Sequence, residues 1–310
     1  MKALVTTLLA VSCTLGGVEA QSTGSILFIG NSFTFASGSP VRFYRANTVT
    51  DLNGEGVGGV PALFKSFTQQ AGLTYDVFLE TRGGVGLDFH LASKRDVIAQ
   101  RPWDIVVMHG YSTLDADKPR DPEKLITTTK QIAELLRGRN PNVSLHVMAT
   151  WSRADQTYPV NGAWTGQPIQ AMARDVRAAY DRAASGANIA SVVPVGEAWI
   201  RAMESGLADP NPYDGIEAGK LNLWTYDNYH ASTYGYYLEA LVVFGSVTGR
   251  DPRSLGRSEC SAFELGLSAA QTQSLQQVAY DQLIAAKRTL SNTPATGAAS
   301  QAAARCAQGR

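Results

Sequence analysis

The feature that most constrains the fold is a regular alternation of short apolar runs with longer segments of helical pattern, which extends from about residue 25 to residue 248. The apolar runs are rich in Val and Ile and are nearly continuous in apolar character. Such runs are typical of strands that are buried on both faces of a parallel sheet. The predicted strands are residues 25–29, 75–80, 104–108, 144–149 and 190–195.

Helical segments separate these strands, and their ends carry residues that commonly begin or stop a helix. Pro61 opens one segment and Gly72 follows it, while Pro102 follows the next. The predicted helices are residues 61–71, 87–100, 121–137, 168–185 and 232–248, and a last helix covers about 268–290. Strands that alternate with helices in this way predict an α/β fold, a three-layer α/β/α sandwich around a parallel, doubly wound sheet of five strands.

Three regions lie outside this alternation. Residues 1–20 combine a positive start, a short apolar stretch and a small-residue cleavage signal that ends at Ala20, which is the pattern of a secretory signal peptide. The apolar stretch is well short of the ~20 residues that a spanning helix needs, so we expect a secreted or periplasmic protein without stable membrane insertion. Residues 36–60 are rich in Gly, Asn and Ser and form a long loop, which is either a cover over a functional site or a mobile excursion. Residues 291–310 are a low-complexity tail that we expect to be disordered, which leaves residues 21–290 as the folded domain.

The composition restricts the partners that this chain can have. Lys plus Arg and Asp plus Glu both number 27, and no block of like charge occurs, so a nucleic-acid partner has no electrostatic support. No Cys/His cluster has the spacing of metal ligands, so we expect no metal. Removal of the leader takes Cys13 with it and leaves Cys260 and Cys306, for which a disulfide and two separate thiols both stay open. The oligomeric state is not indicated by the sequence.

Two short motifs at opposite ends of the domain carry chemically capable side chains. Residues 26–34, Ile-Leu-Phe-Ile-Gly-Asn-Ser-Phe-Thr, indicate an apolar strand that ends in a tight turn with Ser32. Residues 227–230, Asp-Asn-Tyr-His, stand just before a helical segment. A weak hydroxyl nucleophile needs a base beside it, and that base needs a partner that sets its tautomer and stabilises its charged form. Ser32, His230 and Asp227 supply those three chemical types.

The order Ser…Asp…His, with the aspartate three residues before the histidine, resembles that of the SGNH (GDSL-type) hydrolases, a family of esterases, lipases and deacetylases. The resemblance covers roughly residues 25–248, although Asn31 replaces the Asp of the family's usual Gly-Asp-Ser. It implies a flavodoxin-like fold and the hydrolysis of small-molecule or polysaccharide esters without a cofactor. Ser32 would be the nucleophile, His230 the base, and Asp227 the group that orients and stabilises the imidazolium.

The other two motifs of the family contribute donors to the oxyanion hole, which stabilises the negative oxygen of the transition state. By resemblance, Gly84 in Thr-Arg-Gly-Gly-Val-Gly corresponds to the family's glycine, and the amide of Ser32 is a second donor. After the third strand the family has Gly-x-Asn-Asp, but this chain has His-Gly-Tyr-Ser-Thr and lacks the asparagine. Ser112 aligns with the missing residue, and His109 is the alternative third donor.

A non-catalytic glycan- or nucleotide-binding module on the same fold is the alternative function, because fold alone does not imply chemistry. The two hypotheses differ in whether Ser32 and His230 have to meet. We expect His90 to have a packing or hydrogen-bonding role and His146 a structural one. Aromatic residues near the predicted strand ends suit a sugar ring or an aryl group, or else ordinary loop packing: they are Trp151, Tyr158, Trp164, Tyr213, Trp224, Tyr226 and Tyr229.

Overall fold

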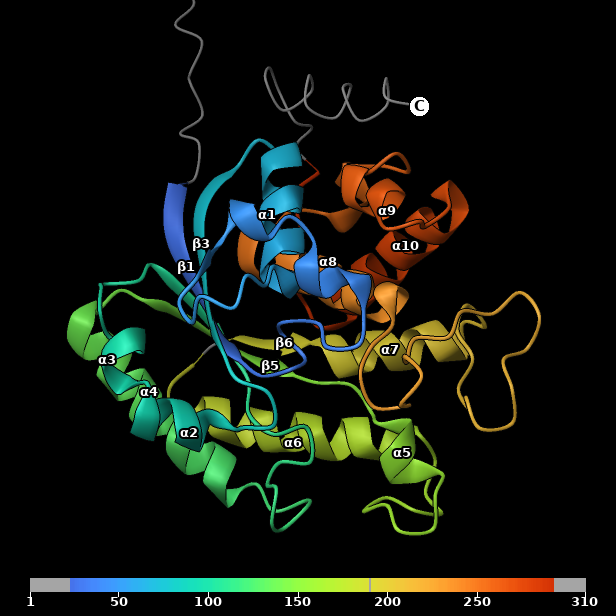
Figure 1. Ribbon diagram of the computed structural model, residues 1–310, viewed down its shortest axis with the longest axis horizontal. Coiled ribbons are helices and arrows are strands. Elements are labelled where there is room, and N and C mark those ends of the chain that lie inside the picture. Colours follow the sequence, from blue (N-terminus) through green and yellow to red (C-terminus); the bar gives the residue numbers. More distant parts are fainter. Residues whose placement is uncertain (1–22, 190, 293–310) are drawn as a thin grey trace, which may run out of the picture.

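The computed structural model describes residues 23–189 and 191–292, and within them six parallel strands form one sheet (Figure 1). The strand order is β2-β3-β1-β4-β5-β6. The strands are β1 (Thr23–Gly30), β2 (Thr50–Asp51), β3 (Thr74–Thr81), β4 (Ile105–Met108), β5 (Ser144–Ala149) and β6 (Ser191–Pro194). Without β2 at the edge, this is the doubly wound order of flavodoxin-like folds, in which the chain reverses direction across the sheet at the first strand.

The parallel sheet and its position between helices are confirmed, but the predicted number of five strands is wrong. The sixth strand, β2, lies inside residues 36–60, which were predicted to be an irregular loop. It pairs with Phe78 and Leu79 of β3 over two residues only, which is too short to leave a hydrophobic pattern. The same segment also contains two short 3-10 helices, Pro40–Phe43 and Ala46–Thr48.

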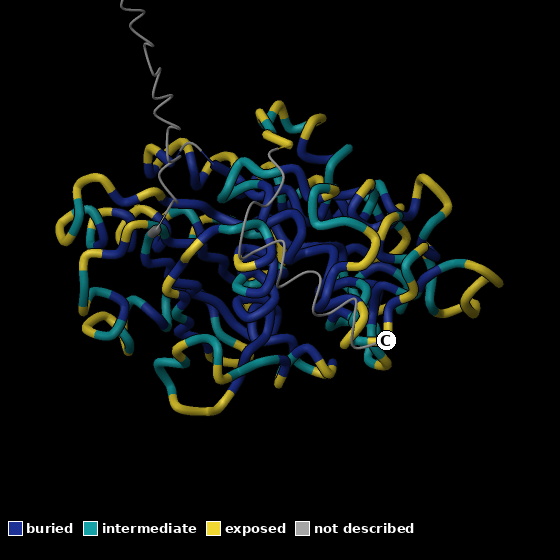
Figure 2. The backbone as a smooth tube through the Cα atoms, turned by 90° about the horizontal axis from the view of Figure 1, so that it is seen from above, coloured by how far each residue is buried: buried dark blue, intermediate teal, exposed yellow. Residues whose placement is uncertain are grey.

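Helices cover both faces of the sheet, as the two helical layers of Figure 1 show. One layer consists of α1 (Gly59–Gln70), α7 (Val195–Glu204), α8 (Thr233–Thr248) and α10 (Ala269–Ala285). The other consists of α2 (Leu87–Ser93), α3 (Arg95–Ile98), α4 (Glu123–Arg139) and α6 (Gln170–Gly186). Each layer forms a separate apolar core against its own face of the sheet. Figure 2 shows the same arrangement as a buried centre with exposed loops around it.

The helices differ from the prediction in two places. The segment 87–100 is not one helix, because Lys94 has non-helical backbone angles and separates α2 from α3. Helix α7 was not predicted, because it follows β6 directly at Pro194 and the two read as one apolar run. Two short helices, α5 (Ala154–Thr157) and α9 (Cys260–Glu264), complete the described chain together with the 3-10 helix Pro252–Leu255.

Several predictions fall on segments that the structure does not describe. The signal peptide at 1–20 and residues 293–310 of the predicted tail lie outside the described residues, as does Cys306. Cys260 is buried at the start of α9 and is disulfide-bonded, so of the two alternatives left open by the sequence it does not have a free thiol. Ser291, the first residue of the predicted tail, accepts a hydrogen bond from the N–H of Asp251 at 2.9 Å. Among residues 23–189 and 191–292, no helix is long and apolar enough to cross a bilayer.

A carboxylate joins the amino ends of the two central strands. Asp104 precedes β4, and its Oδ2 accepts hydrogen bonds from the backbone N–H of Ser25 at 2.7 Å and from the Ser25 hydroxyl at 2.8 Å. These two hydrogen bonds hold the pKa of Asp104 below its ordinary value, and the one from the Ser25 backbone has the larger effect. A carboxyl with a lowered pKa in the folded state stabilises the fold above its unfolded pKa of ~3.9.

We therefore expect Asp104→Asn to lower the melting temperature at pH 7, because the amide accepts these hydrogen bonds less strongly than a carboxylate. The difference from wild type should shrink as the pH falls below about 3.9, because protonation removes the same charge in the wild-type protein. Thermal unfolding followed by circular dichroism at pH 7 and pH 3 measures this. Asp76→Asn, at an exposed position of β3, is the control, and a difference that stays constant with pH would contradict the assignment.

Candidate active site

The side chains of the three predicted catalytic residues meet at the carboxyl edge of the sheet. Ser32 lies in the turn after β1, and β1 is the strand between β3 and β4 in the sheet. Asp227 and His230 both lie in the turn before α8. His230 Nε2 is 2.9 Å from Ser32 Oγ, and His230 Nδ1 is 2.6 Å from Asp227 Oδ2. The two motifs at opposite ends of the domain are thus joined in the order Ser–His–Asp, at the switch point where open α/β sheets bind ligands.

Asp227 organises the turn that carries His230. Its Oδ1 accepts hydrogen bonds from the backbone N–H groups of Tyr229 and His230, at 3.0 and 2.9 Å. Burial alone would raise the pKa of Asp227, but the hydrogen bonds from the ring and backbone of His230 and from the backbone of Tyr229 hold it below its ordinary value. An ionised carboxylate only accepts, so Nδ1 carries the proton and Nε2 is the acceptor that faces the Ser32 hydroxyl.

The end of β1 is closely packed beneath Ser32. A Cβ on Gly30 would lie 2.2 Å from Thr34 Oγ1 and 2.5 Å from His109 Nε2, so only glycine fits there. His109 Nδ1 is 3.1 Å from the carbonyl oxygen of Gly110, and Nε2 is 2.7 Å from Thr34 Oγ1. Since a carbonyl only accepts, Nδ1 donates to Gly110 and the Thr34 hydroxyl donates to Nε2.

This arrangement corrects the prediction of His109 as an oxyanion donor. The ring is buried, both of its nitrogens already have partners, and burial lowers its pKa to about 4, so it is neutral. The side chain of a residue one position before the glycine of a strand-end turn points into the core, where it braces the turn of Thr34.

Two backbone donors beside Ser32 have no acceptor. Within residues 23–189 and 191–292, the N–H groups of Ser32 and Gly84 donate to no backbone or side-chain atom. Gly84 has a φ of +72°, which favours glycine, and a Cβ there would meet no atom within 4 Å because the position faces a cavity. Ser32 is buried and Gly84 is exposed where it lines the cavity, so both free donors can hydrogen-bond to an incoming negative oxygen.

Ser112, the other predicted third donor, lines the same cavity as Gly84. Its Oγ accepts a hydrogen bond from Arg153 Nη1 at 3.3 Å. The Ser112 hydroxyl proton is therefore still available for donation, since the oxygen is the acceptor in that contact. Ser112 thus keeps its candidate role as the third donor, and His109 does not.

Asn31 joins three strand-end loops. In the sequence, only the departure from Gly-Asp-Ser marked this position. Its Nδ2 donates to the carbonyl oxygens of Val85 at 2.9 Å and Gly110 at 3.2 Å, in the loops after β3 and β4. Its Oδ1 accepts from the N–H of Phe33 at 3.1 Å. An aspartate could accept from Phe33 but could not donate to the two carbonyls, so the amide suits this chain.

Aromatic rings continue from the core to the imidazole. Trp199 of α7 stacks on Trp151 at 4.7 Å and 4°, and Trp151 stacks on Phe33 at 3.9 Å and 8°. Phe33 meets the His230 ring edge to face, at 5.8 Å and 74°. Because Phe33 follows Ser32 directly, the same packed column positions both Ser32 and the His230 ring.

Tyr229 lies between His230 and an arginine that the sequence analysis did not identify. The Tyr229 and His230 ring centroids are 4.1 Å apart with a tilt of 30°, and Arg153 Cζ lies 3.4 Å over the Tyr229 ring. Two groups this close to one ring occupy opposite faces of it. Arg153 precedes α5 in a loop, and no motif or periodicity marks it in the sequence.

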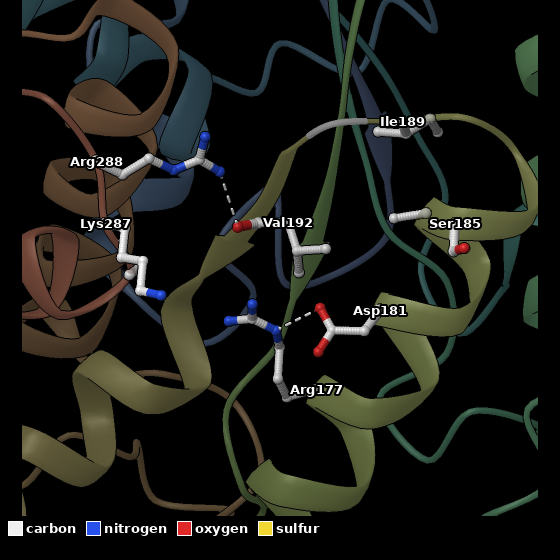
Figure 3. Close-up of a pocket in the computed structure, with 9 residues that line it drawn as sticks. Arg177, Asp181, Ser185, Ile189, Val192, Lys287 and Arg288 are labelled. Carbon is white, nitrogen blue, oxygen red and sulfur yellow. Dashed lines mark hydrogen bonds and ion pairs between the residues drawn. The ribbon is translucent and has the colours of Figure 1, made fainter.

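Two cavities need to be distinguished. The one beside the Ser–His pair has a volume of about 290 Å³, and its lining includes Asn31, Gly84, Ser112, Arg153, Gln156 and Tyr229. A larger cavity of about 460 Å³, shown in Figure 3, is lined by Arg177, Asp181, Lys287 and Arg288 among others. Its lining includes Val192 near the start of β6, so it lies at the amino edge of the sheet, away from the candidate site.

The remaining histidines and several aromatic residues pack in the interior. His90 is buried and pairs with Glu80, and His146 contacts the hydroxyls of Ser144 and Ser191 at 3.1 and 2.8 Å. Burial lowers the pKa of His146 to about 4. Of the seven aromatic residues named from the sequence, Tyr229 lines the cavity, and Tyr111, which the sequence analysis did not name, lines it as well. Trp151, Trp164 and Trp224 are buried.

We expect Asn31→Asp to lower kcat by at least tenfold, because a carboxylate would face two carbonyl oxygens and the loops bearing Gly84 and Ser112 would separate. Leaving buried acceptors without donors should also cost about 1–3 kcal/mol of unfolding free energy. Ester hydrolysis and urea unfolding measure the two effects. Asn142→Asp, at an exposed loop position, is the control. A fully active Asn31→Asp enzyme would show that the hydrogen bonds from Asn31 to Val85 and Gly110 are not needed for activity.

Comparison with known proteins bears on the fold. No protein-family model matches this sequence, and no curated protein matches it. Among solved structures, a DUF4886 family protein from Bacteroides uniformis aligns with a TM-score of 0.59 and 17% identity, over 87% of this chain and 98% of the other.

Two further structures align over smaller parts of the chain. A protein from Slackia heliotrinireducens that is provisionally assigned to the SGNH hydrolases gives a TM-score of 0.50 and 19% identity, over 73% of this chain and 99% of the other. An acetyl xylan esterase gives a TM-score of 0.51 and 16% identity, over 72% and 99%. These likenesses, with the strand order and the layers above, show that the chain has the SGNH hydrolase fold.

Proposed function

We propose that this protein is an exported serine esterase that hydrolyses carboxylic esters with short acyl groups. The observation that supports the proposal most strongly is the 2.9 Å contact between Ser32 Oγ and His230 Nε2, with Asp227 on the other ring nitrogen. A binding module on the same fold does not need this contact. Export is a proposal that rests on residues 1–20, and N-terminal sequencing of the exported protein tests it.

The proposed reaction begins with the Ser32 hydroxyl. His230 Nε2 takes its proton while Oγ attacks the carbonyl carbon of the ester, and Asp227 stabilises the imidazolium that forms. The tetrahedral intermediate then collapses, and His230 returns the proton to the departing alcohol. Water, deprotonated by His230, attacks the acyl-enzyme and releases the carboxylic acid.

The negative oxygen of the tetrahedral intermediate needs donors that are already in place. The free N–H groups of Ser32 and Gly84 are two candidates, and the Ser112 hydroxyl is the third. Donors held in position before the reaction cost no reorganisation when charge develops, which is why one of them is worth ~3–4 kcal/mol.

The identity of the alcohol that carries the ester is a separate question from the acyl length. Acetyl esters of polysaccharides are candidates, and a solved neighbour described as an acetyl xylan esterase supports their inclusion in a substrate panel. Aryl esters of increasing acyl length test the short-chain preference beside acetylated xylan and pectin.

We expect Ser32→Ala to abolish hydrolysis, because loss of the nucleophile from such a unit costs up to about 10⁶-fold in kcat. The rate on p-nitrophenyl acetate measures this, with circular dichroism as the check on folding. Ser37→Ala, five residues along the same loop, is the matched control. A Ser32→Ala protein that retains more than a few per cent of the rate, with contaminating esterases excluded, would refute the serine mechanism.

Ser112→Ala should lower kcat by about 10²-fold with little change in KM, because the contact to the oxyanion strengthens only in the transition state. Ser205→Ala, outside the site, serves for comparison under the same steady-state conditions. A loss of less than fivefold would mean that the two backbone donors act alone.

A further inference from the structure

We propose that the cavity beside Ser32 binds an uncharged, hydroxyl-bearing group about the size of one sugar ring, and that Arg153 and Gln156 donate hydrogen bonds to it. This inference rests on the proposed esterase function, since it names the part of the ester that the cavity recognises. At about 290 Å³, the cavity is at the small end of the range for ligand sites, so it suits one compact group.

Arg153 is held in one orientation from several sides. Its Nε donates to Asp155 Oδ1 at 3.0 Å, its Nη2 donates to Asp155 Oδ2 at 2.5 Å, and its Nη1 donates to Ser112 Oγ at 3.3 Å. The Tyr229 ring covers one face of the guanidinium. With a side-chain exposure of only 13%, Arg153 is a fixed part of the cavity wall.

The ion pair decides which charge the cavity accepts. Asp155 neutralises Arg153 and is itself 23% exposed, but it does not line the cavity, so the wall presents a guanidinium whose charge is already balanced by a neighbouring carboxylate. A carboxylate on the ligand would gain little from Arg153 and would be repelled by Asp155. An uncharged ligand avoids this repulsion.

A hydrocarbon chain is disfavoured for a different reason. It would displace water from Arg153 and Gln156, which line the cavity, without offering hydrogen bonds, and removing water from charged and polar groups is costly. In an apolar pocket each added CH₂ would instead strengthen binding. The polar wall therefore predicts that longer acyl or alkyl groups give no gain.

Hydrogen-bonding capacity remains for hydroxyl groups. Gln156 Nε2 uses one proton for Asp155 Oδ2 at 3.1 Å, which leaves its second proton free. Arg153 Nη1 likewise has a second proton, and Thr113 Oγ1, which donates to the carbonyl of Asp115, can still accept. Fixed donors and an acceptor around a small space match a ring with several hydroxyls.

The test compares three acetyl esters: acetylated methyl glucoside, acetylated methyl glucuronide and p-nitrophenyl acetate. The first two differ by one carboxylate. Wild type, Arg153→Met and Gln156→Leu are assayed, with Arg182→Met as the matched control because Arg182 also pairs with a carboxylate, Glu123, but lies exposed on α6. We expect the ratio of kcat/KM for the glucoside ester to that for p-nitrophenyl acetate to fall at least tenfold in Arg153→Met and severalfold in Gln156→Leu, and to stay constant in Arg182→Met.

Each other outcome is informative. Wild type that prefers the glucuronide would make the cavity a carboxylate site, and wild type that prefers p-nitrophenyl octanoate to the acetate would make it a hydrocarbon site. Unchanged ratios in both Arg153→Met and Gln156→Leu would remove these residues from recognition. If no ester is hydrolysed, the proposed function fails. The cavity is then judged by saturation-transfer NMR of methyl glucoside with wild type and Gln156→Leu, where equal signals overturn the inference.

Discussion

The rest of the candidate site depends on the hydrogen bonds that the side-chain amide of Asn31 makes to its two neighbouring loops. In a parallel sheet the carboxyl ends of neighbouring strands lie side by side, but the loops that leave them diverge unless something holds them. Asn31 sits at the end of β1 and donates to one carbonyl in each of the two flanking loops. Those loops carry Gly84 and Ser112, so one side chain sets the spacing between Ser32 and two of the candidate oxyanion donors.

The His230 ring is positioned by a second set of contacts, which are largely apolar. The stacked rings of Trp199, Trp151 and Phe33 lead from α7 to the edge of the imidazole. Tyr229 then covers the imidazole, with Arg153 on its other face. Aromatic stacking of this kind limits how the His230 ring can tilt, while Asp227 limits how it can rotate about its own axis. The polar and apolar contacts therefore restrain different motions of the same group.

The fold was predictable from the sequence wherever the hydrophobic pattern was long enough. The five predicted strands and the six long helical segments have counterparts in the structure because buried strands and amphipathic helices leave periodic signals. Strand β2 has only two residues, so it leaves no such signal. Helix α7 was missed because it begins at Val195, directly after β6 ends at Pro194. With no loop between them, the strand and the helix form one continuous apolar run in the sequence.

The sequence by itself determined the candidate catalytic group, because Ser32, Asp227 and His230 supply a nucleophile, a carboxylate and a base in an order along the chain that resembles that of the SGNH hydrolases. Only the tertiary structure decided the surroundings of that group. It turned His109 inward to Thr34 and Gly110, gave Asn31 its two carbonyl partners, and brought Arg153 onto Tyr229. These contacts join loops from different strands, and sequence periodicity describes a single element at a time. Long-range partners of irregular loops are therefore set by the way the strands assemble, which no local pattern records.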